Sequence, residues 1–383
     1  MKNKVIFGKP DIRTQDVIAV KEVLKSGWIG MGGVTQLLEQ AFSKFTGAKY
    51  AVAVSSGSAG LFLSLLACGI GKGDEVITSP MTFPATANEI LHTGAKVRFV
   101  DIDETGNIDT DKIEQAITKK TKAILPVHLY GRPCNMNRII EIARAYRLLI
   151  IEDAAHAFGA VYKNKHIGNI GDATVFSLYA TKNITAGEGG VVTTNNKAIA
   201  DKIRLLRSYG ITRNAWSRFT KKNNSKPYDT VLPGYNFEIP DILAALALSQ
   251  INTFKERFER RRYIWQVYNQ AFEGLNIGLP FPVCDNASIH AMHLYTIMVD
   301  KRRAGIDRKD FIKKLDKMGI GTGIHFISLH LHSFYKKLYN LKNTDFPVAL
   351  SFSEQTLSLP LSSGMTDRDI NRVVIAVRRV CNG

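Results

Sequence analysis

Residues 148–156 read Leu-Leu-Ile-Ile-Glu-Asp-Ala-Ala-His. The first four residues are apolar without any alternation, which is typical of a strand in a parallel sheet that is covered on both faces. Asp153 follows the apolar run 148–152, so its carboxylate should lie at the carboxyl edge of the sheet, where open α/β proteins bind ligands. The alternative is that Asp153 caps a following helix.

Six further runs of similar length lie between residues 50 and 195, and helical stretches separate most of them. They are Tyr50–Val54, Glu75–Thr78, Lys96–Val100, Ala123–Val127, Ala173–Phe176 and Gly190–Thr194. Apolar strands that alternate with amphipathic helices predict an α/β fold, with a mostly parallel seven-stranded sheet between helices.

The pattern changes beyond residue 215. Residues 215–232 are polar and predict a long loop, whereas residues 241–272 have helical apolar spacing that suits two helices or one bent helix. A predicted strand at 294–299 and helices at 308–318 and 367–380 complete a small C-terminal α+β domain. We therefore expect a large domain at 1–255 and a small one at 256–383.

The 383-residue chain has 51 basic and 34 acidic residues, a formal net charge of +17. The basic residues are scattered, as at 119–122, 260–262 and 301–303, and no nucleic-acid-binding motif accompanies them. A solvated basic surface is the first interpretation, attraction of an anionic substrate the second, and nucleic-acid binding the third.

Nothing in the sequence predicts a metal, disulfide or membrane segment. Four cysteines lie far apart without a CxxC pair. The longest nearly apolar run, 59–70, is shorter than the roughly 20 residues that a membrane-spanning helix needs. The first ten residues lack the apolar core of a signal peptide. We expect a cytoplasmic protein that binds neither metal, membrane nor nucleic acid.

A Gly/Ser turn follows the first predicted strand. Residues 54–60 read Val-Ser-Ser-Gly-Ser-Ala-Gly, and an apolar helix follows at once. Free backbone N–H groups and the positive end of the helix dipole would favour a phosphate there. Small-residue turns also precede many helices for purely structural reasons, so this signal alone does not decide.

A single lysine, Lys182, lies in a small polar loop between two predicted strands, and Gly187-Glu188-Gly189-Gly190 ends that loop. An exposed lysine with a pKa of about 10.4 is a poor nucleophile because it is mostly protonated. In a covered site its amine loses the proton more readily and can form a Schiff base. Loop lysines are usually only solvated, but the glycine-bounded surroundings favour a functional role.

At these residues the chain resembles the DegT/StrS-type nucleotide-sugar aminotransferases, which have the aspartate aminotransferase-like fold of type I pyridoxal 5′-phosphate (PLP) enzymes. The resemblance rests on Ser177-x4-Lys182-x4-Gly-Glu-Gly-Gly and the upstream Glu-Asp-Ala-Ala-His. Shorter matches extend it nearly from end to end: Ser26–Trp28, Ser56–Ala59, Pro80–Phe83, Pro126–Gly131, Gly234–Asn236 and Gly321–Phe326.

The resemblance implies a role for individual residues. Lys182 would carry PLP as a Schiff base and move the proton during transfer, and Asp153 would hold the ring nitrogen. His156 would contact the ring hydroxyl, and Phe83 would stack on the ring. Gly57, Ser58 and Ser177 match phosphate ligands, and Trp28 and His325 match substrate contacts. Asn236 matches a residue that reaches the phosphate in the neighbouring subunit.

The resemblance therefore implies a homodimer with shared sites, and we expect a partner surface to cover the apolar helix that begins at Asp241. It also implies transfer from L-glutamate, which becomes 2-oxoglutarate, to a nucleotide-linked keto-sugar. A UDP-4-keto sugar fits best, for cell-surface polysaccharide, lipopolysaccharide or glycan synthesis. Enzymes that aminate UDP-4-keto-L-pentose (giving UDP-4-amino-4-deoxy-L-arabinose) and those that aminate UDP-4-keto-6-deoxy-HexNAc are both similar.

Three positions depart from many relatives: Leu178, Tyr179 and Glu238. They put inferred sugar contacts in doubt. The alternatives are a dTDP- or GDP-linked 3- or 4-keto-6-deoxy sugar and, more remotely, a non-catalytic regulator with a PLP fold. A PLP sugar dehydratase would carry His in place of Lys182, which argues against that class.

Overall fold

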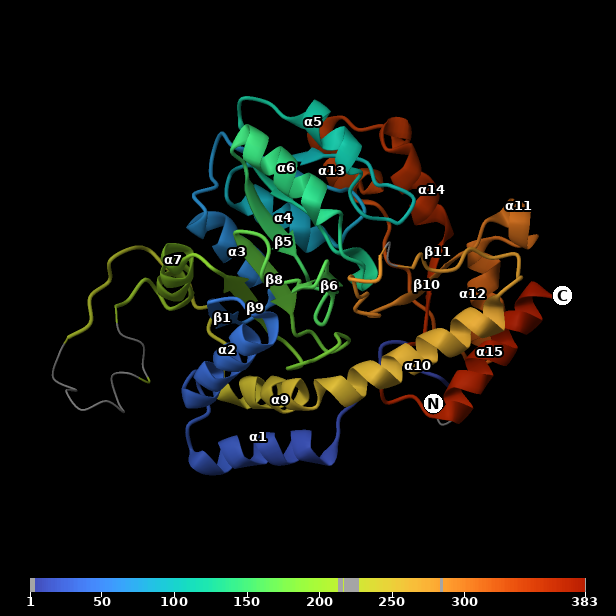
Figure 1. Cartoon of the computed structure of the whole chain (residues 1–383), viewed down its shortest axis with the longest axis horizontal. Helices are drawn as coiled ribbons and strands as arrows, with labels where there is room; N and C mark the ends of the chain where they lie inside the picture. Colours follow the sequence, from blue (N-terminus) through green and yellow to red (C-terminus); the bar gives the residue numbers. More distant parts are fainter. Residues whose placement is uncertain (1–3, 213–215, 217–226, 283–284, 383) are drawn as a thin grey trace.

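The computed structural model describes residues 4–212, 216, 227–282 and 285–382. Most of the loop predicted at 215–232, and also Cys284, lie outside the described residues. Figure 1 shows a central sheet with helices on both sides, and much of the C-terminal segment, in orange and red, gathered beyond one end of it.

The central sheet has seven strands in the order β1-β9-β8-β5-β4-β2-β3. They are β1 (Tyr50–Val54), β2 (Glu75–Thr78), β3 (Lys96–Phe99), β4 (Thr121–Leu125), β5 (Leu149–Asp153), β8 (Ala173–Ser177) and β9 (Gly190–Thr194). Strand β9 is antiparallel to both of its neighbours, and the remaining neighbours are parallel. The predicted mostly parallel seven-stranded sheet is confirmed.

Helices bury both faces of this sheet. Those around it are α1 (Thr14–Ser26), α2 (Gly33–Thr46), α3 (Gly57–Ala67), α4 (Pro84–His92), α5 (Ile113–Ala116), α6 (Met136–Tyr146), α7 (Lys197–Arg207) and α9 (Asp241–Asn252). Val52 and Val54 of β1 pack into a core with α3, α4 and α7, whereas Ala51 and Ala53 pack into another with α2 and α9. Because alternate residues of a strand point to opposite faces, burial on both faces explains the unbroken apolar runs.

The predicted helical stretch 241–272 is two helices, α9 and α10 (Phe254–Phe272), which meet at Thr253. Both α1 and α2 pack against α9. Helices of the same chain therefore cover part of this apolar helix, and its cover by a partner chain stays a prediction. The Asp241 carboxylate, at the start of α9, accepts hydrogen bonds from the backbone N–H groups of Gly32, Val34 and Thr35, and so caps α2 instead of its own helix.

The C-terminal part has a separate core. Helices α10, α12 (Arg308–Lys317) and α15 (Asp367–Cys381) surround the antiparallel pair β10 (Tyr295–Met298) and β11 (Thr356–Leu359). Val5 packs into the same core from the other end of the chain. The remaining elements are β6 (Val161–Tyr162), β7 (Lys165–His166), α11 (Lys301–Ala304), α13 (Ser333–Tyr339), α14 (Pro347–Gln355) and the 3-10 turns Thr110–Lys112, Leu129–Gly131, Leu329–Leu331 and Asn343–Asp345. The division at residue 255 stays a prediction.

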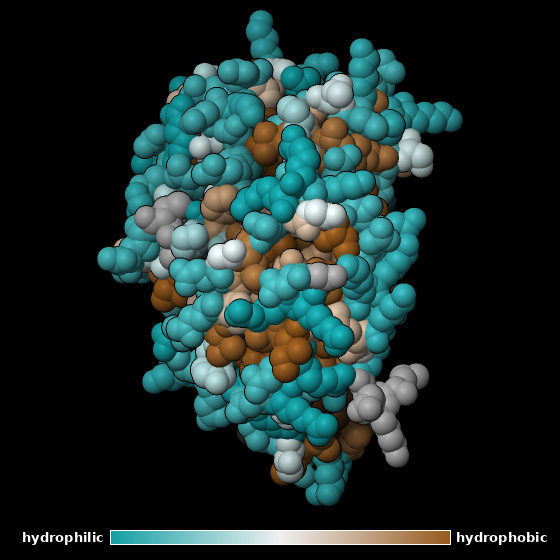
Figure 2. Space-filling model, turned by 90° about the vertical axis from the view of Figure 1, so that its right-hand side faces the viewer, coloured by the Kyte–Doolittle hydropathy of each residue, from teal (hydrophilic) through white to brown (hydrophobic). Residues whose placement is uncertain are grey.

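Most of the surplus charge that the sequence analysis singled out is exposed. Lys119, Lys120, Lys122 and the 301–303 cluster lie on the surface, whereas Arg261 is buried. Figure 2 shows a mostly hydrophilic face with apolar residues gathered near its middle. Among the described helices, each is too short or too polar to cross a bilayer.

Candidate active site

A cavity of about 500 Å³ opens at the carboxyl ends of β5 and β8. Eight residues predicted from the sequence line it: Gly57, Ser58, Phe83, Asp153, His156, Ser177, Lys182 and His325. They come from segments that are distant in the sequence, and the parallel strands bring them together because those strands end at one edge of the sheet.

The N-terminus of α3 forms one wall of the cavity. The Ser56 side chain caps this helix by accepting a hydrogen bond from the Ala59 N–H at 3.0 Å. The N–H groups of Gly57 and Ser58 belong to the first turn, which has no intrahelical acceptors. The turn packs closely against Gly190 of β9. Any larger residue at Gly190 would clash, because its Cβ would lie 2.5 Å from the Ser56 carbonyl oxygen. These features suit an anion at the helix start.

Asp153, the last residue of β5, is 6% exposed and is anchored by its neighbours. Its Oδ2 accepts a hydrogen bond from Thr86 Oγ1 at 2.7 Å, and its Oδ1 accepts one from the Ala155 N–H at 3.1 Å. Thr82 Oγ1 lies 2.7 Å from Thr86 Oγ1 and extends this network. No helix directly follows Asp153, so the alternative role as a helix cap does not apply.

Lys182 also lines the cavity, and it lies in the loop between β8 and β9. Burial lowers the pKa of its amine to about 8, although the nearby Asp153 carboxylate acts in the opposite direction. The adjacent Asn183 fixes the loop, because its Nδ2 donates to the carbonyl oxygens of Phe158 and Ala291. The loop therefore presents an amine with a larger neutral fraction than an exposed lysine has, as a nucleophilic lysine requires.

Three histidines lie beside the lysine. His156 packs on His293 with 4.5 Å between ring centroids, and His325 also lines the cavity. Burial is the main reason that the pKa of each of the three imidazoles is lowered, to about 4 for His325, and the positive charge of Lys182 contributes. The Tyr130 N–H donates to His156 Nδ1 at 3.2 Å, so the neutral ring carries its proton on Nε2.

Two predicted site residues lie outside this cavity lining. Trp28 Nε1 donates to the Met31 carbonyl, and its ring packs edge-on against Trp216. Asn236 is exposed and pairs with Ser208 in an isolated bridge. Glu238, one of the departures from the relatives, accepts a hydrogen bond from Ser208 Oγ at 2.6 Å.

Several residues that line the cavity or support its side chains were not predicted from the sequence. Phe7 and Gly8 line the cavity, and Thr86 supports Asp153. Thr86 lies in the first turn of α4, which follows the Pro80–Phe83 motif, and its place beside that motif was a usable signal. Tyr130 had no comparable signal, because its backbone N–H acts on a histidine 26 positions away.

The chain matches the model of the DegT/DnrJ/EryC1/StrS aminotransferase family over residues 10–378. The chain belongs to this family. It is a PLP-dependent sugar aminotransferase of the α/β fold expected from the sequence.

Relatives and solved structures agree with this family membership. The spore coat polysaccharide biosynthesis protein SpsC of Bacillus subtilis is 46% identical over 379 residues, which cover 98% of this chain and 97% of SpsC. Spr1654 of Streptococcus pneumoniae, described as a sugar aminotransferase, has PMP and PLP forms. Its PMP form has a TM-score of 0.91 at 32% identity, covering 99% of this chain and 98% of Spr1654.

A further solved structure is Helicobacter pylori PseC, an aminotransferase involved in pseudoaminic acid biosynthesis. It has a TM-score of 0.90 at 28% identity and covers 99% of both chains.

The cavity of this family member fits the chemistry of PLP. Lys182 offers an amine with a lowered pKa, and Asp153 offers an anchored carboxylate for a ring nitrogen. The start of α3 offers N–H groups for a phosphate. By contrast, no cluster of three or more metal-ligating side chains is found in the described part of the chain.

Proposed function

We propose that this aminotransferase moves an amino group from L-glutamate to the keto carbon of a nucleotide-linked sugar, with a UDP-4-keto sugar as the acceptor. The products would be a UDP-4-amino sugar and 2-oxoglutarate. The observation that carries the proposal is the convergence of Lys182, Asp153 and the start of α3 on one cavity. The roles of SpsC in spore coat polysaccharide biosynthesis and of PseC in pseudoaminic acid biosynthesis support a place in cell-surface polysaccharide, lipopolysaccharide or glycan synthesis.

When bound, PLP supplies an electron sink and carries the amino group between donor and acceptor. We assign to Lys182 the covalent attachment of the cofactor and the proton transfer at the sugar carbon that receives the amine. Its lowered pKa supports both roles, because the neutral amine is the reactive form. Asp153 would keep the ring nitrogen protonated, and Thr86 would hold that carboxylate in place.

The other predicted residues would orient the cofactor. With Nδ1 occupied by the Tyr130 N–H, His156 has its Nε2 proton free to donate to the ring hydroxyl. Gly57, Ser58 and Ser177 would bind the phosphate, and Phe83 would stack on the ring. Phe83 is 59% exposed, and its ring lies 5.9 Å from that of Phe326, so both can contact a planar group at the cavity mouth.

We further propose a cytoplasmic homodimer in which Asn236 completes the partner's phosphate site and Trp28 and His325 contact the sugar. The described cavity lining contains no arginine and only one lysine, yet the substrate carries a diphosphate. Cationic or polar groups from outside this lining are therefore needed. Exposed apolar side chains also lie close together in the N-terminal sequence and would suit a subunit interface: Ile12, Val17, Ile18, Leu24, Ile29 and Leu37.

A substrate panel tests the acceptor. Purified protein loaded with PLP is incubated with L-glutamate and, separately, UDP-4-keto-pentose, UDP-4-keto-6-deoxy-HexNAc, and dTDP- or GDP-linked 3- and 4-keto-6-deoxy sugars. The largest kcat/KM should belong to a UDP-4-keto sugar. A larger value for a dTDP- or GDP-linked sugar would replace the proposal with that alternative.

Subunit complementation tests the shared site. Mixing Lys182→Ala with Asn236→Ala chains should give hybrids in which one site carries both defects and the other carries neither. Activity should then exceed that of either variant alone. If Asn236→Ala is itself strongly impaired and hybrids confirmed by mass spectrometry show no recovery, each site belongs to one chain.

A further inference from the structure

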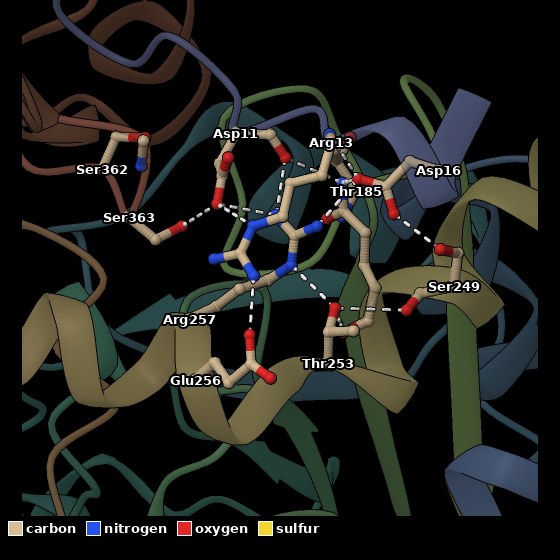
Figure 3. Close-up of polar contacts among 12 residues, drawn as sticks. Asp11, Arg13, Asp16, Thr185, Ser249, Thr253, Glu256, Arg257, Ser362 and Ser363 are labelled. Atoms are coloured by element: carbon tan, nitrogen blue, oxygen red, sulfur yellow. Dashed lines mark hydrogen bonds and ion pairs between the residues drawn. The ribbon is translucent and has the colours of Figure 1, made fainter. Parts of the chain in front are cut away.

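A second buried polar cluster lies directly behind the lysine loop, outside the proposed active site. Figure 3 shows its core, in which Arg257 of α10 points toward Asp11 and Asp16 of the N-terminal segment. Asp16 is fully buried and Arg257 is 1% exposed. The two salt bridges measure 2.8 Å to Asp16 and 2.9 Å to Asp11, and Arg257 Nε also donates to Thr253 Oγ1.

Gln250 of α9 connects this cluster to the lysine loop. Its Nε2 donates to the Asp11 carbonyl at 3.2 Å and lies 3.4 Å from Asp16 Oδ2. These contacts leave its Oε1 facing the other way, where it accepts the Thr185 backbone N–H at 3.0 Å. The Asp11 carbonyl and the Asp16 carboxylate, which Arg257 holds, therefore favour the orientation in which the Gln250 carbonyl oxygen meets the loop.

Thr185 connects Gln250 to the backbone around Lys182 through hydrogen bonds of its own. Its Oγ1 donates to the Leu178 carbonyl and accepts the Gly187 N–H at 2.8 Å, so it closes the loop at both ends. On the other side of Ile184, Asn183 is held by contacts of its own. A shift of the loop backbone at Thr185 would break the bond to Gln250.

We propose that Gln250, oriented by the Arg257–Asp16 ion pair, is a positioning residue that sets where the Lys182 amine lies in the cavity. This inference rests on the proposed role of Lys182. Gln250 does not line the cavity itself, and it acts through the Thr185 backbone. Catalytic geometry is sensitive to such support, since a misplacement of about 1 Å can cost on the order of 100-fold in rate.

The test compares Gln250→Met with Ser249→Ala in the full-length protein loaded with PLP. Methionine has a similar length but cannot accept the Thr185 N–H. Ser249 is the matched control, because it is adjacent in α9 and its hydroxyl donates to Asp16 at 2.6 Å, whereas Gln250 is the residue of this pair that accepts a hydrogen bond from the loop. Rates are divided by the amount of bound cofactor, and melting temperatures are recorded for each variant.

We expect Gln250→Met to lower kcat on the order of 100-fold, with KM changed less than about threefold because the substrate contacts remain. The pH at which the visible absorption band of the bound cofactor titrates should also shift, since the amine has moved. Ser249→Ala should keep kcat within about twofold of the wild-type value. Gln250→Ala, which leaves a space in place of an apolar side chain, provides the same test if Gln250→Met does not fold.

Failure of the positioning role of Gln250 and failure of the proposed role of Lys182 give different results. If Gln250→Met loses thermal stability but keeps the wild-type kcat per bound cofactor and the same spectral titration, the positioning role is refuted. If Lys182→Ala, measured in parallel, retains a borohydride-reducible link to the cofactor, the proposed role of Lys182 itself fails, whatever Gln250 does.

Discussion

Lys182 is half-buried in the wall of the cavity and Arg257 is fully buried behind it, and the surroundings of their cationic groups differ. Arg257 has two carboxylates, a carbonyl and a hydroxyl within hydrogen-bond distance. Burial lowers the pKa of Lys182 to about 8, and Asp153 only partly offsets this effect. The loop thus separates a cation whose charge is compensated from one whose charge is not.

This difference separates a structural from a reactive side chain. A buried ion that is paired keeps its charge and stabilises the contact on which other residues depend. A buried amine without sufficient compensation gives up its proton, which makes it a nucleophile. The Asp16–Arg257 cluster also fastens the N-terminal segment that carries Phe7 and Gly8 into the wall of the cavity.

The largest effect is expected for Lys182→Ala. Loss of both covalent attachment and proton transfer should reduce turnover by about 10⁴-fold or more. Borohydride treatment followed by mass spectrometry should find no adduct at this position, and the purified variant should lack the visible band of the wild-type protein. An unchanged adduct would assign the cofactor to another lysine.

Arg257→Met and Lys182→Met should have opposite effects on the stability of the cofactor-free protein. Removing Arg257 leaves the fully buried Asp16 without its cation, which should destabilise the fold by about 3–5 kcal/mol, whereas Asp11 keeps its salt bridge to Arg13. Removing Lys182 deletes a poorly compensated amine, so stability should stay constant or rise. Urea unfolding measures the free energy of unfolding of each variant. Equal losses in the two variants would contradict the difference between a compensated Arg257 and an uncompensated Lys182.

Asp153→Asn should retain cofactor but lower kcat by about 100-fold or more, because a neutral amide cannot hold the ring nitrogen in its protonated form. His156→Ala removes one neutral hydrogen bond to the cofactor, besides the one from the Tyr130 N–H, and should cost only about five- to tenfold in kcat. Single-turnover rates with L-glutamate provide the measurement. A greater loss at His156 would mean that the roles of the two residues are reversed.

The lowered pKa of Lys182 predicts a pH dependence for cofactor attachment. Only the unprotonated amine reacts, so the rate should rise about tenfold per pH unit below the pKa and level off above about 8. Stopped-flow absorbance after mixing apoprotein with PLP follows this step. A plateau that begins only near pH 10 would show that the amine is not desolvated in solution.

Much of the sheet and part of the site could be predicted from local sequence. The seven strands lie within two residues of the predicted runs, because a strand buried on both faces needs an unbroken apolar segment wherever it occurs. Asp153 and Lys182 could be singled out for a related reason. Asp153 ends such a segment, Lys182 lies in the loop between two of them, and the motifs around both residues match a family pattern.

Only the tertiary structure decided the antiparallel direction of β9, the hydrogen-bond partner of Asp153 and the structural role of Arg257. Thr86 and Asp153 are 67 positions apart, and Asp16 and Arg257 are 241 apart. In sequence, Arg257 is one more charge on a predicted helix. Its role depends on how the backbone brings the N-terminal segment back over the junction of α9 and α10, and local hydrophobic periodicity carries no information about such distant pairing.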